Sequence, residues 1–146
     1  MLWINRLPED CTLIFLGDFC IGNDAEWHRE LFLGRKFKKI LVRGNHDRKS
    51  ASFYTSHGWD FVCDSFSLAI YGRKILFSHT PQPIVGHNCN IHGHCHNHLR
   101  DGEYGGIYTP FHKLLAMEST NYQVVELRGF VEKAGLKKVK EPLTKS

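Results

Sequence analysis

Four short apolar segments of this 146-residue chain each end in a polar turn. Residues 12–16, 39–42 and 74–77 are apolar runs typical of buried strands, and residues 90–92 form a shorter one. In α/β sheets, ligands bind outside the carboxyl ends of the strands, so such turns can meet at one point. The turns that follow the four segments are Gly17-Asp18, Gly44-Asn45-His46-Asp47, Ser78-His79 and Gly93-His94-Cys95-His96.

The last of these turns lies in a histidine-rich stretch. Residues 91–98 contain four histidines and one cysteine. Histidine is the commonest metal ligand in proteins, and a His-x-His pattern places two imidazoles on the same side of an extended backbone. His94 and His96 can therefore reach one small volume, and we interpret this stretch as half of a metal site. Distant residues would supply the other half.

The remaining pattern predicts one domain that spans residues 1–146. A helix capped by Asn23 or Asp24 and ending near Leu33 is expected, with Trp27 and His28 among its inward residues. Residues 49–57 predict a short helix and residues 71–73 a hairpin turn. Residues 114–118 and 122–127 predict a closing strand pair, residues 130–136 a short helix, and residues 137–146 a flexible basic tail.

Composition restricts the class of protein. A hydrophobic content of 42% is enough for a core, and a net charge of +4 does not indicate a nucleic-acid surface. The five cysteines are irregularly spaced and follow no signal peptide, so we expect free thiols in the cytoplasm. No apolar run reaches the roughly 18 residues that a membrane span requires.

A local structural zinc site is an alternative interpretation of the histidine-rich stretch. Its ligands would be Cys89, His92, Cys95 and His98, at a spacing that a tetrahedral zinc can accept. Closed zinc sites are most needed in small domains that lack a hydrophobic core. This chain has the composition to form such a core. The alternative also leaves Asp18, Asn45 and His79 without a role.

The order Gly-Asp, Gly-Asn-His-Asp, His and Gly-His-x-His resembles the calcineurin-like metallophosphoesterase family. Four of the five motifs of that family are present, in order, from residue 17 to residue 96. The combination of Gly-Asn-His-Asp with a downstream Gly-His-x-His is the specific part of the resemblance. It implies an α/β (layered α+β) fold, a sandwich of two β-sheets flanked by helices. It also implies hydrolysis of a phosphomonoester or a phosphodiester by a metal-activated hydroxide.

The resemblance assigns a role to each polar residue. Asp18 would bridge two metals, with Asn45, His79 and His94 completing one site and His96 belonging to the other. His46 would protonate the leaving oxygen, and Asp47 would orient its imidazole. Mixed Asp, Asn and His ligation suits Mn²⁺, Fe²⁺ or Fe³⁺, Zn²⁺ or Ni²⁺ better than Mg²⁺. The substrate would be a phosphorylated small molecule or a nucleotide, with nucleic acid unsupported, and no substrate-binding residue can be assigned.

The chain departs from the family pattern at its beginning. No Asp-x-His motif precedes Asp18, so the first strand and most of the first helix of the fold are expected to be missing. One metal would then lack ligands, and the chain would hold one metal where the family holds two. Three explanations remain open: a truncated form of an ordinary enzyme, a natural single-metal form, or ligands supplied by a second chain.

The missing strand has two further consequences. It would leave an exposed sheet edge, through which copies of the chain could pair into a homo-oligomer. It also leaves open a non-catalytic alternative, in which the chain is a metal-stabilised binding module.

Overall fold

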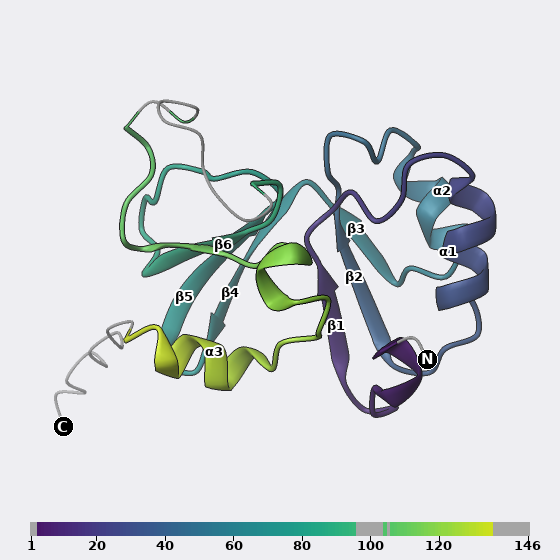
Figure 1. Cartoon of the computed structure of the whole chain (residues 1–146), viewed down its shortest axis with the longest axis horizontal. Coiled ribbons are helices and arrows are strands. Elements are labelled where there is room, and N and C mark those ends of the chain that lie inside the picture. Colours follow the sequence, from purple (N-terminus) through teal and green to yellow (C-terminus); the bar gives the residue numbers. More distant parts are fainter. Residues whose placement is uncertain (1–2, 96–103, 105, 136–146) are drawn as a thin grey trace, which may run out of the picture.

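The computed structural model describes residues 3–95, 104 and 106–135 of the chain. Figure 1 shows two sheets side by side, with helices against the outer surface of the one that carries the N-terminal strands. In chain order the elements are η1 (Trp3–Arg6), β1 (Thr12–Phe15), α1 (Asp24–Phe32), β2 (Lys38–Val42), α2 (Ala51–Ser56), β3 (Phe61–Cys63), β4 (Ser65–Ile70), β5 (Arg73–Ser78), β6 (Cys89–His92), β7 (His112–Leu114), η2 (Glu118–Thr120) and α3 (Leu127–Lys133).

The first sheet is parallel, in the order β1-β2-β3. Ile14 pairs with Ile40, and Leu41 pairs with Val62. Parallel neighbours need a crossover connection, and α1 and α2 provide the two crossovers. The carboxyl ends of β1 and β2 therefore lie at the same edge of the sheet.

Alternation along the strands divides the core into two layers. Leu13 and Leu41 pack with Phe32 of α1 and Tyr54 of α2 on one face of the first sheet. The next residue of β2, Val42, points to the opposite face and packs with residues of the second sheet and α3. The first sheet is thus covered by helices on one side and by the second sheet on the other. The predicted class, two sheets flanked by helices, is confirmed.

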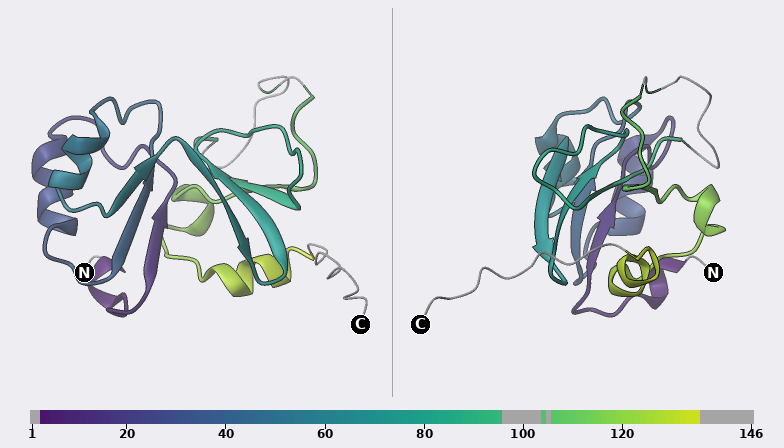
Figure 2. Two further views of the ribbon diagram at one scale, coloured as in Figure 1. Left: turned by 180° about the vertical axis from the view of Figure 1, so that it is seen from behind. Right: turned by 90° about the vertical axis from the view of Figure 1, so that its left-hand side faces the viewer.

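The second sheet has the order β4-β5-β6-β7. Only Asp64 separates β3 from β4, so the chain passes directly from one sheet to the other. Seen from behind, the two sheets meet at this corner and diverge from it (Figure 2). The predicted hairpin joins β4 to β5 through Tyr71 and Gly72, whose φ angles of 53° and 70° suit a two-residue turn. β5, β6 and β7 run parallel to one another.

The predicted closing strand pair is wrong. β7 has only three residues, and residues 122–126 form no strand. Asn121 and Tyr122 both adopt left-handed backbone conformations, with φ angles of 51° and 57°, which reverse the chain after η2. Glu126 then accepts hydrogen bonds from the N–H groups of Arg128 and Gly129 and begins α3, three residues before the predicted start.

Two further expectations are corrected at the N-terminal side. Trp27 is 47% exposed, whereas His28 is fully buried and shares its helix face with Phe32, four residues on. β1 was expected to be buried on both faces, but only its Leu13 is buried. Among the described strands β1 pairs with β2 alone, so it is an edge strand.

Two other expectations concern the chain as a whole. No helix in the described ranges is long and apolar enough to cross a membrane. The predicted flexible tail, residues 137–146, lies outside the described residues.

Replacement of Leu41 by alanine should lower the free energy of unfolding by about 2–5 kcal/mol, because its fully buried side chain lies at the centre of the helix-facing core. Leu33, which is 51% exposed, provides the matched control, and Leu33→Ala should change stability by less than about 0.5 kcal/mol. Urea unfolding measures the change in the free energy of unfolding for each variant. Equal losses for the two variants would contradict this division of core and surface.

Candidate metal centre

Asp18, Asn45, His79 and His94 come from four separate turns and meet at one point. His79 Nε2 lies 2.9 Å from Asn45 Oδ1, 3.1 Å from Asp18 Oδ2 and 3.1 Å from His94 Nδ1. His94 Nδ1 is also 3.1 Å from Asn45 Oδ1. Within the described residues, Asp18, His79 and His94 form the single group of three acidic, His or Cys side chains close enough to share a metal ion. The structure therefore brings together four of the five ligands predicted from the sequence.

The ring of His79 is fixed by the end of β1. Its Nδ1 lies 2.6 Å from the carbonyl oxygen of Leu16, so Nδ1–H donates to that oxygen. In the neutral imidazole, Nε2 then carries a lone pair. A backbone carbonyl on the opposite ring nitrogen is the usual way in which a metal-binding histidine is oriented.

The four converging atoms fit a cation. The Nε2 lone pair of His79 faces a carboxylate oxygen and an amide oxygen, and these atoms repel one another unless a proton or a metal ion lies between them. In the metal-free protein, a protonated His79 can form an ion pair with Asp18. When the imidazole is neutral, two oxygens and two nitrogens are available to a divalent metal of borderline softness.

Two of these ligands have unusual backbone conformations. Asp18 and His94 have φ angles of 56° and 65°, in the left-handed region that non-glycine residues rarely occupy. Such conformations cost on the order of 1–3 kcal/mol and cluster at functional sites. With these conformations, both side chains come within 3.1 Å of His79 Nε2.

Glycines allow the turns to approach closely. A Cβ on Gly17 would lie 2.4 Å from the backbone nitrogen of Gly44, and a Cβ on Gly44 would lie 2.1 Å from Asp18 Oδ1. A Cβ on Gly93 would lie 3.0 Å from the carbonyl oxygen of Leu16. The glycine that precedes each of Asp18, Asn45 and His94 therefore allows the close packing, and Gly17, with a φ angle of 90°, is also needed for its turn.

Asp47 is placed differently from the expectation that it orients His46. Its carboxylate is buried, and Oδ2 accepts hydrogen bonds from the N–H groups of Asp18 (2.7 Å) and Gly44 (2.8 Å). His46 donates its own backbone N–H to Asp18 Oδ1 (2.8 Å), and its side chain is exposed. Asp47 thus joins the turns after β1 and β2, and the imidazole of His46 extends into solvent beside Asp18.

The ligand predicted for the second metal, His96, lies outside the described residues. The described members of the alternative zinc site do not gather, since Cys89, His92 and Cys95 form no group close enough to share a metal. Cys89 packs in the core beneath the second sheet, and His92, three residues further along the strand, points to the opposite face. Burial lowers the pKa of His92 to about 4, so its imidazole stays neutral near pH 7.

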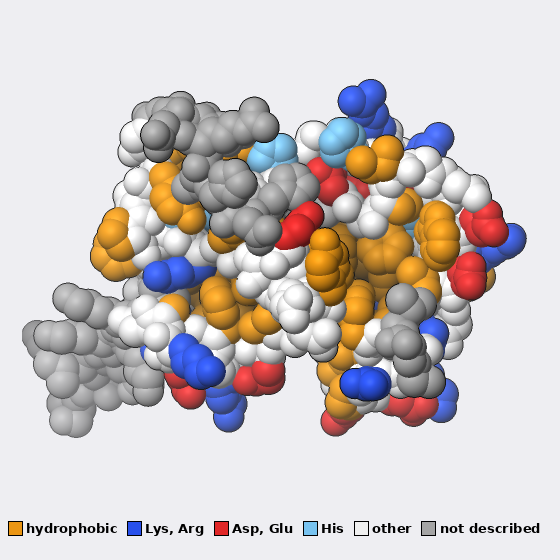
Figure 3. Space-filling model, viewed as in Figure 1, with side chains coloured by type: hydrophobic (Ala, Val, Ile, Leu, Met, Phe, Trp, Pro, Cys, Tyr) orange, Lys and Arg blue, Asp and Glu red, His pale blue; other side chains and the backbone are white. Residues whose placement is uncertain are grey.

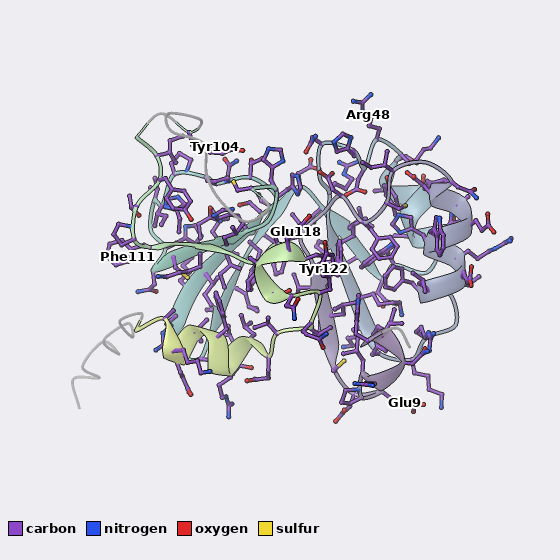
Figure 4. The ribbon with its side chains drawn as sticks, viewed as in Figure 1. Glu9, Arg48, Tyr104, Phe111, Glu118 and Tyr122 are labelled. Carbon is purple, nitrogen blue, oxygen red and sulfur yellow. The ribbon has the colours of Figure 1, made fainter. Side chains whose placement is uncertain are left out.

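Sequence reasoning missed two residues at the rim of the centre. Arg48 and Tyr104 both lie at the upper edge of the molecule in Figure 4, and histidine side chains reach the surface on this edge in Figure 3. Arg48 Nε lies 3.4 Å from the Asn45 carbonyl oxygen, and the ring of Tyr104 is 6.3 Å from that of His94. Arg48 directly follows Gly-Asn-His-Asp and could have been noticed, whereas nothing in the sequence pattern marks Tyr104.

Comparisons with known proteins identify a family and similar structures. The family model described as calcineurin-like phosphoesterase matches residues 2–125. The structure is similar to that of a protein of unknown function from Aquifex aeolicus, with a TM-score of 0.65 and 23% identity, covering 90% of this chain and 80% of that one. A nuclease from Pseudomonas putida, named MPE, matches with a TM-score of 0.43 and 27% identity over 58% of this chain and 44% of its own. No curated protein matches the chain.

Substitution of Gly44 by alanine should abolish tight metal binding, because the new Cβ would displace the Asp18 carboxylate from the centre. We expect the Mn²⁺ affinity, measured by titration calorimetry, to fall at least tenfold. Gly129→Ala in α3 is the control and should bind Mn²⁺ like the parent protein. Unchanged Mn²⁺ affinity in the Gly44 variant would argue against the close approach of the two turns.

Proposed function

We propose, on the premise that this chain belongs to the calcineurin-like phosphoesterase family, that it is a metal-dependent hydrolase of a phosphomonoester or a phosphodiester. The observation that supports the proposal best is the convergence of acceptor atoms from Asp18, Asn45, His79 and His94. Phosphoester hydrolysis needs a positive charge at the phosphoryl oxygens. These four side chains are suited to hold a metal cation that would supply this charge.

A divalent cation held there would polarise a phosphoryl oxygen and lower the pKa of a water molecule. Asp18 and Asn45 would contribute oxygens, and His79 and His94 nitrogens, of which His79 is already oriented by Leu16. This mixed set favours Mn²⁺, Fe²⁺ or Fe³⁺, Zn²⁺ or Ni²⁺ over Mg²⁺. Mn²⁺ is the first metal to test.

In this proposal His46 is the general acid. Its imidazole is exposed beside Asp18, and the hydrogen bond from its backbone N–H to Asp18 Oδ1 fixes its position relative to the metal ligands. A ring N–H of His46 would give its proton to the leaving oxygen as the bond to phosphorus breaks. Asp47 supports this step indirectly, because it holds the turn from which His46 extends.

Two residues at the rim suggest how a substrate is oriented. The guanidinium of Arg48 can pair with a phosphate oxygen, and the ring of Tyr104 offers a flat surface beside His94. We propose a phosphorylated small molecule or a nucleotide as the substrate, and a cytoplasmic setting, in which thiols such as those of Cys11, Cys20 and Cys63 stay reduced.

The edge strand β1 suggests a partner. Asp18 also lines a cavity of about 120 Å³, with mainly apolar walls that include Trp3, Phe15 and Phe19. An unpaired edge beside an apolar cavity can accept a further strand. A second copy of the chain is our proposal for its source, and a dimer in analytical ultracentrifugation would support it, whereas a monomer at all concentrations would oppose it.

A non-catalytic, metal-stabilised binding module is the second candidate function. It is favoured by one observation, that the described residues provide the ligands of a single metal. The number of metal ions bound per chain, measured together with phosphoester turnover, distinguishes the enzyme from the binding module. One bound metal and no hydrolysis of any phosphoester would favour the binding module.

Hydrolysis of bis(4-nitrophenyl) phosphate with added Mn²⁺ tests the enzyme. Asn45→Ala should reduce both Mn²⁺ affinity and turnover, by tenfold or more, because it removes a proposed ligand. His46→Ala should retain Mn²⁺ and lose about 10²–10⁴-fold in kcat on a substrate with a poor leaving group. Nitrophenolate needs little protonation, so the loss on the nitrophenyl ester should be smaller.

His87→Ala is the control for both changes, since His87 binds Ser67 away from the metal ligands. Turnover that is the same in the parent protein and in the Asn45 and His46 variants would rule out the proposed mechanism. Equal losses on both types of leaving group would remove the role of His46 as an acid.

A further inference from the structure

Among the residues that the structure describes, three buried side-chain atoms lack a hydrogen-bond partner, and two of them have complementary chemistry. One is Nε2 of His28, a fully buried residue of α1, and the other is Oδ1 of Asp47, a residue that is 4% exposed. Buried polar atoms in native proteins nearly always have a partner. These two therefore call for an explanation.

The proton of His28 can be assigned from its other ring nitrogen. The indole N–H of Trp59 lies 2.7 Å from His28 Nδ1, and an indole nitrogen can only donate. Nδ1 must therefore accept. Burial lowers the pKa of His28, which keeps the ring neutral, so its one proton is on Nε2. His28 Nε2–H is thus a donor without an acceptor, and Asp47 Oδ1 is an acceptor without a donor.

Both groups border the same buried region between α1, α2 and the turn after β2. The ring of His28 packs edge-on against Tyr54 of α2, with 5.1 Å between centroids. The Tyr54 hydroxyl accepts a hydrogen bond from the backbone N–H of Lys49, two residues after Asp47. Burial lowers the pKa of His28 and raises that of Tyr54, and the negative charge of Asp47 acts on both rings, since it raises the pKa of each.

We propose that His28 is a positioning residue for the metal centre, whose Nε2–H donates to Asp47 Oδ1 across one buried water. The other oxygen of Asp47 holds the N–H groups of Asp18 and Gly44, so this contact fixes the carboxylate that joins the two turns. A chain of contacts then runs from Trp59 through His28 and Asp47 to Asp18. The inference rests on the proposed metal site, but His28 itself touches neither metal nor substrate.

Replacement of His28 tests this role. His28→Leu removes the donor and should weaken Mn²⁺ binding about tenfold, whereas His28→Gln keeps an N–H group and should restore most of the affinity. Phe32→Leu lies in the same core and controls for lost packing: it should lower Tm and leave Mn²⁺ affinity unchanged. Equal Mn²⁺ affinity in the parent and the His28→Leu variant would overturn the proposal, as would an equal loss in Phe32→Leu.

Tyr54 is the competing donor to Asp47, and Tyr54→Phe distinguishes the two. We expect this variant to bind Mn²⁺ like the parent protein, and a loss confined to Tyr54→Phe would transfer the role from His28 to Tyr54. If His28→Leu does not fold, Trp59→Phe replaces it. That variant keeps the imidazole but frees Nδ1, and it should also weaken Mn²⁺ binding.

Imidazole ¹⁵N spectra of the metal-free protein give an independent measurement. His28 should show a protonated Nε2 and an unprotonated Nδ1, with a slowly exchanging Nε2–H, and the opposite tautomer would overturn the proposal. If the parent protein bound no Mn²⁺ at all, the proposed function would fail and the positioning role would fail with it. The ¹⁵N spectra would still test the tautomer assigned to His28.

Discussion

The buried carboxylate of Asp47 is the contact on which the rest of the centre depends. Its two hydrogen bonds, to the N–H groups of Asp18 and Gly44, join the carboxyl ends of β1 and β2 where no side chain could fit between them. Hydrogen bonds to an ionised acceptor are stronger than those between neutral groups. With the two turns held, Asp18 is directed toward His79 and the second sheet, and the ligands of both sheets can meet.

The sequence was sufficient to predict which polar turns converge, because the rule behind that prediction is geometric. Turns that follow the strands of an α/β fold lie at their carboxyl ends, and the family resemblance then selected Asp18, Asn45, His79 and His94 within these turns. The strands themselves could be recognised from continuous apolar runs. The hairpin at Tyr71-Gly72 followed from its turn residues.

What the sequence could not predict depends on contacts between distant segments. Residues 122–126 contain strand-forming side chains, yet the left-handed conformations of Asn121 and Tyr122 redirect the chain, and the local pattern does not reveal this. Asp47 was expected to contact its neighbour His46, whereas backbone amides brought close by two glycines offer it better partners. His28 resembled any inward helix position, and its role becomes visible only once Trp59 and Asp47 are placed around it.

The distribution of ligands over both sheets gives a bound metal a mechanical role. Asn45 lies in the turn after β2 of the first sheet and His94 in the turn after β6 of the second, and they are 49 residues apart in the sequence. A cation that binds both is a cross-link that closes this long loop. A covalent link over such a loop would remove about 4 kcal/mol of chain entropy from the unfolded state. Metal binding would therefore stabilise the folded state of the whole molecule, as a reversible cross-link between its two sheets.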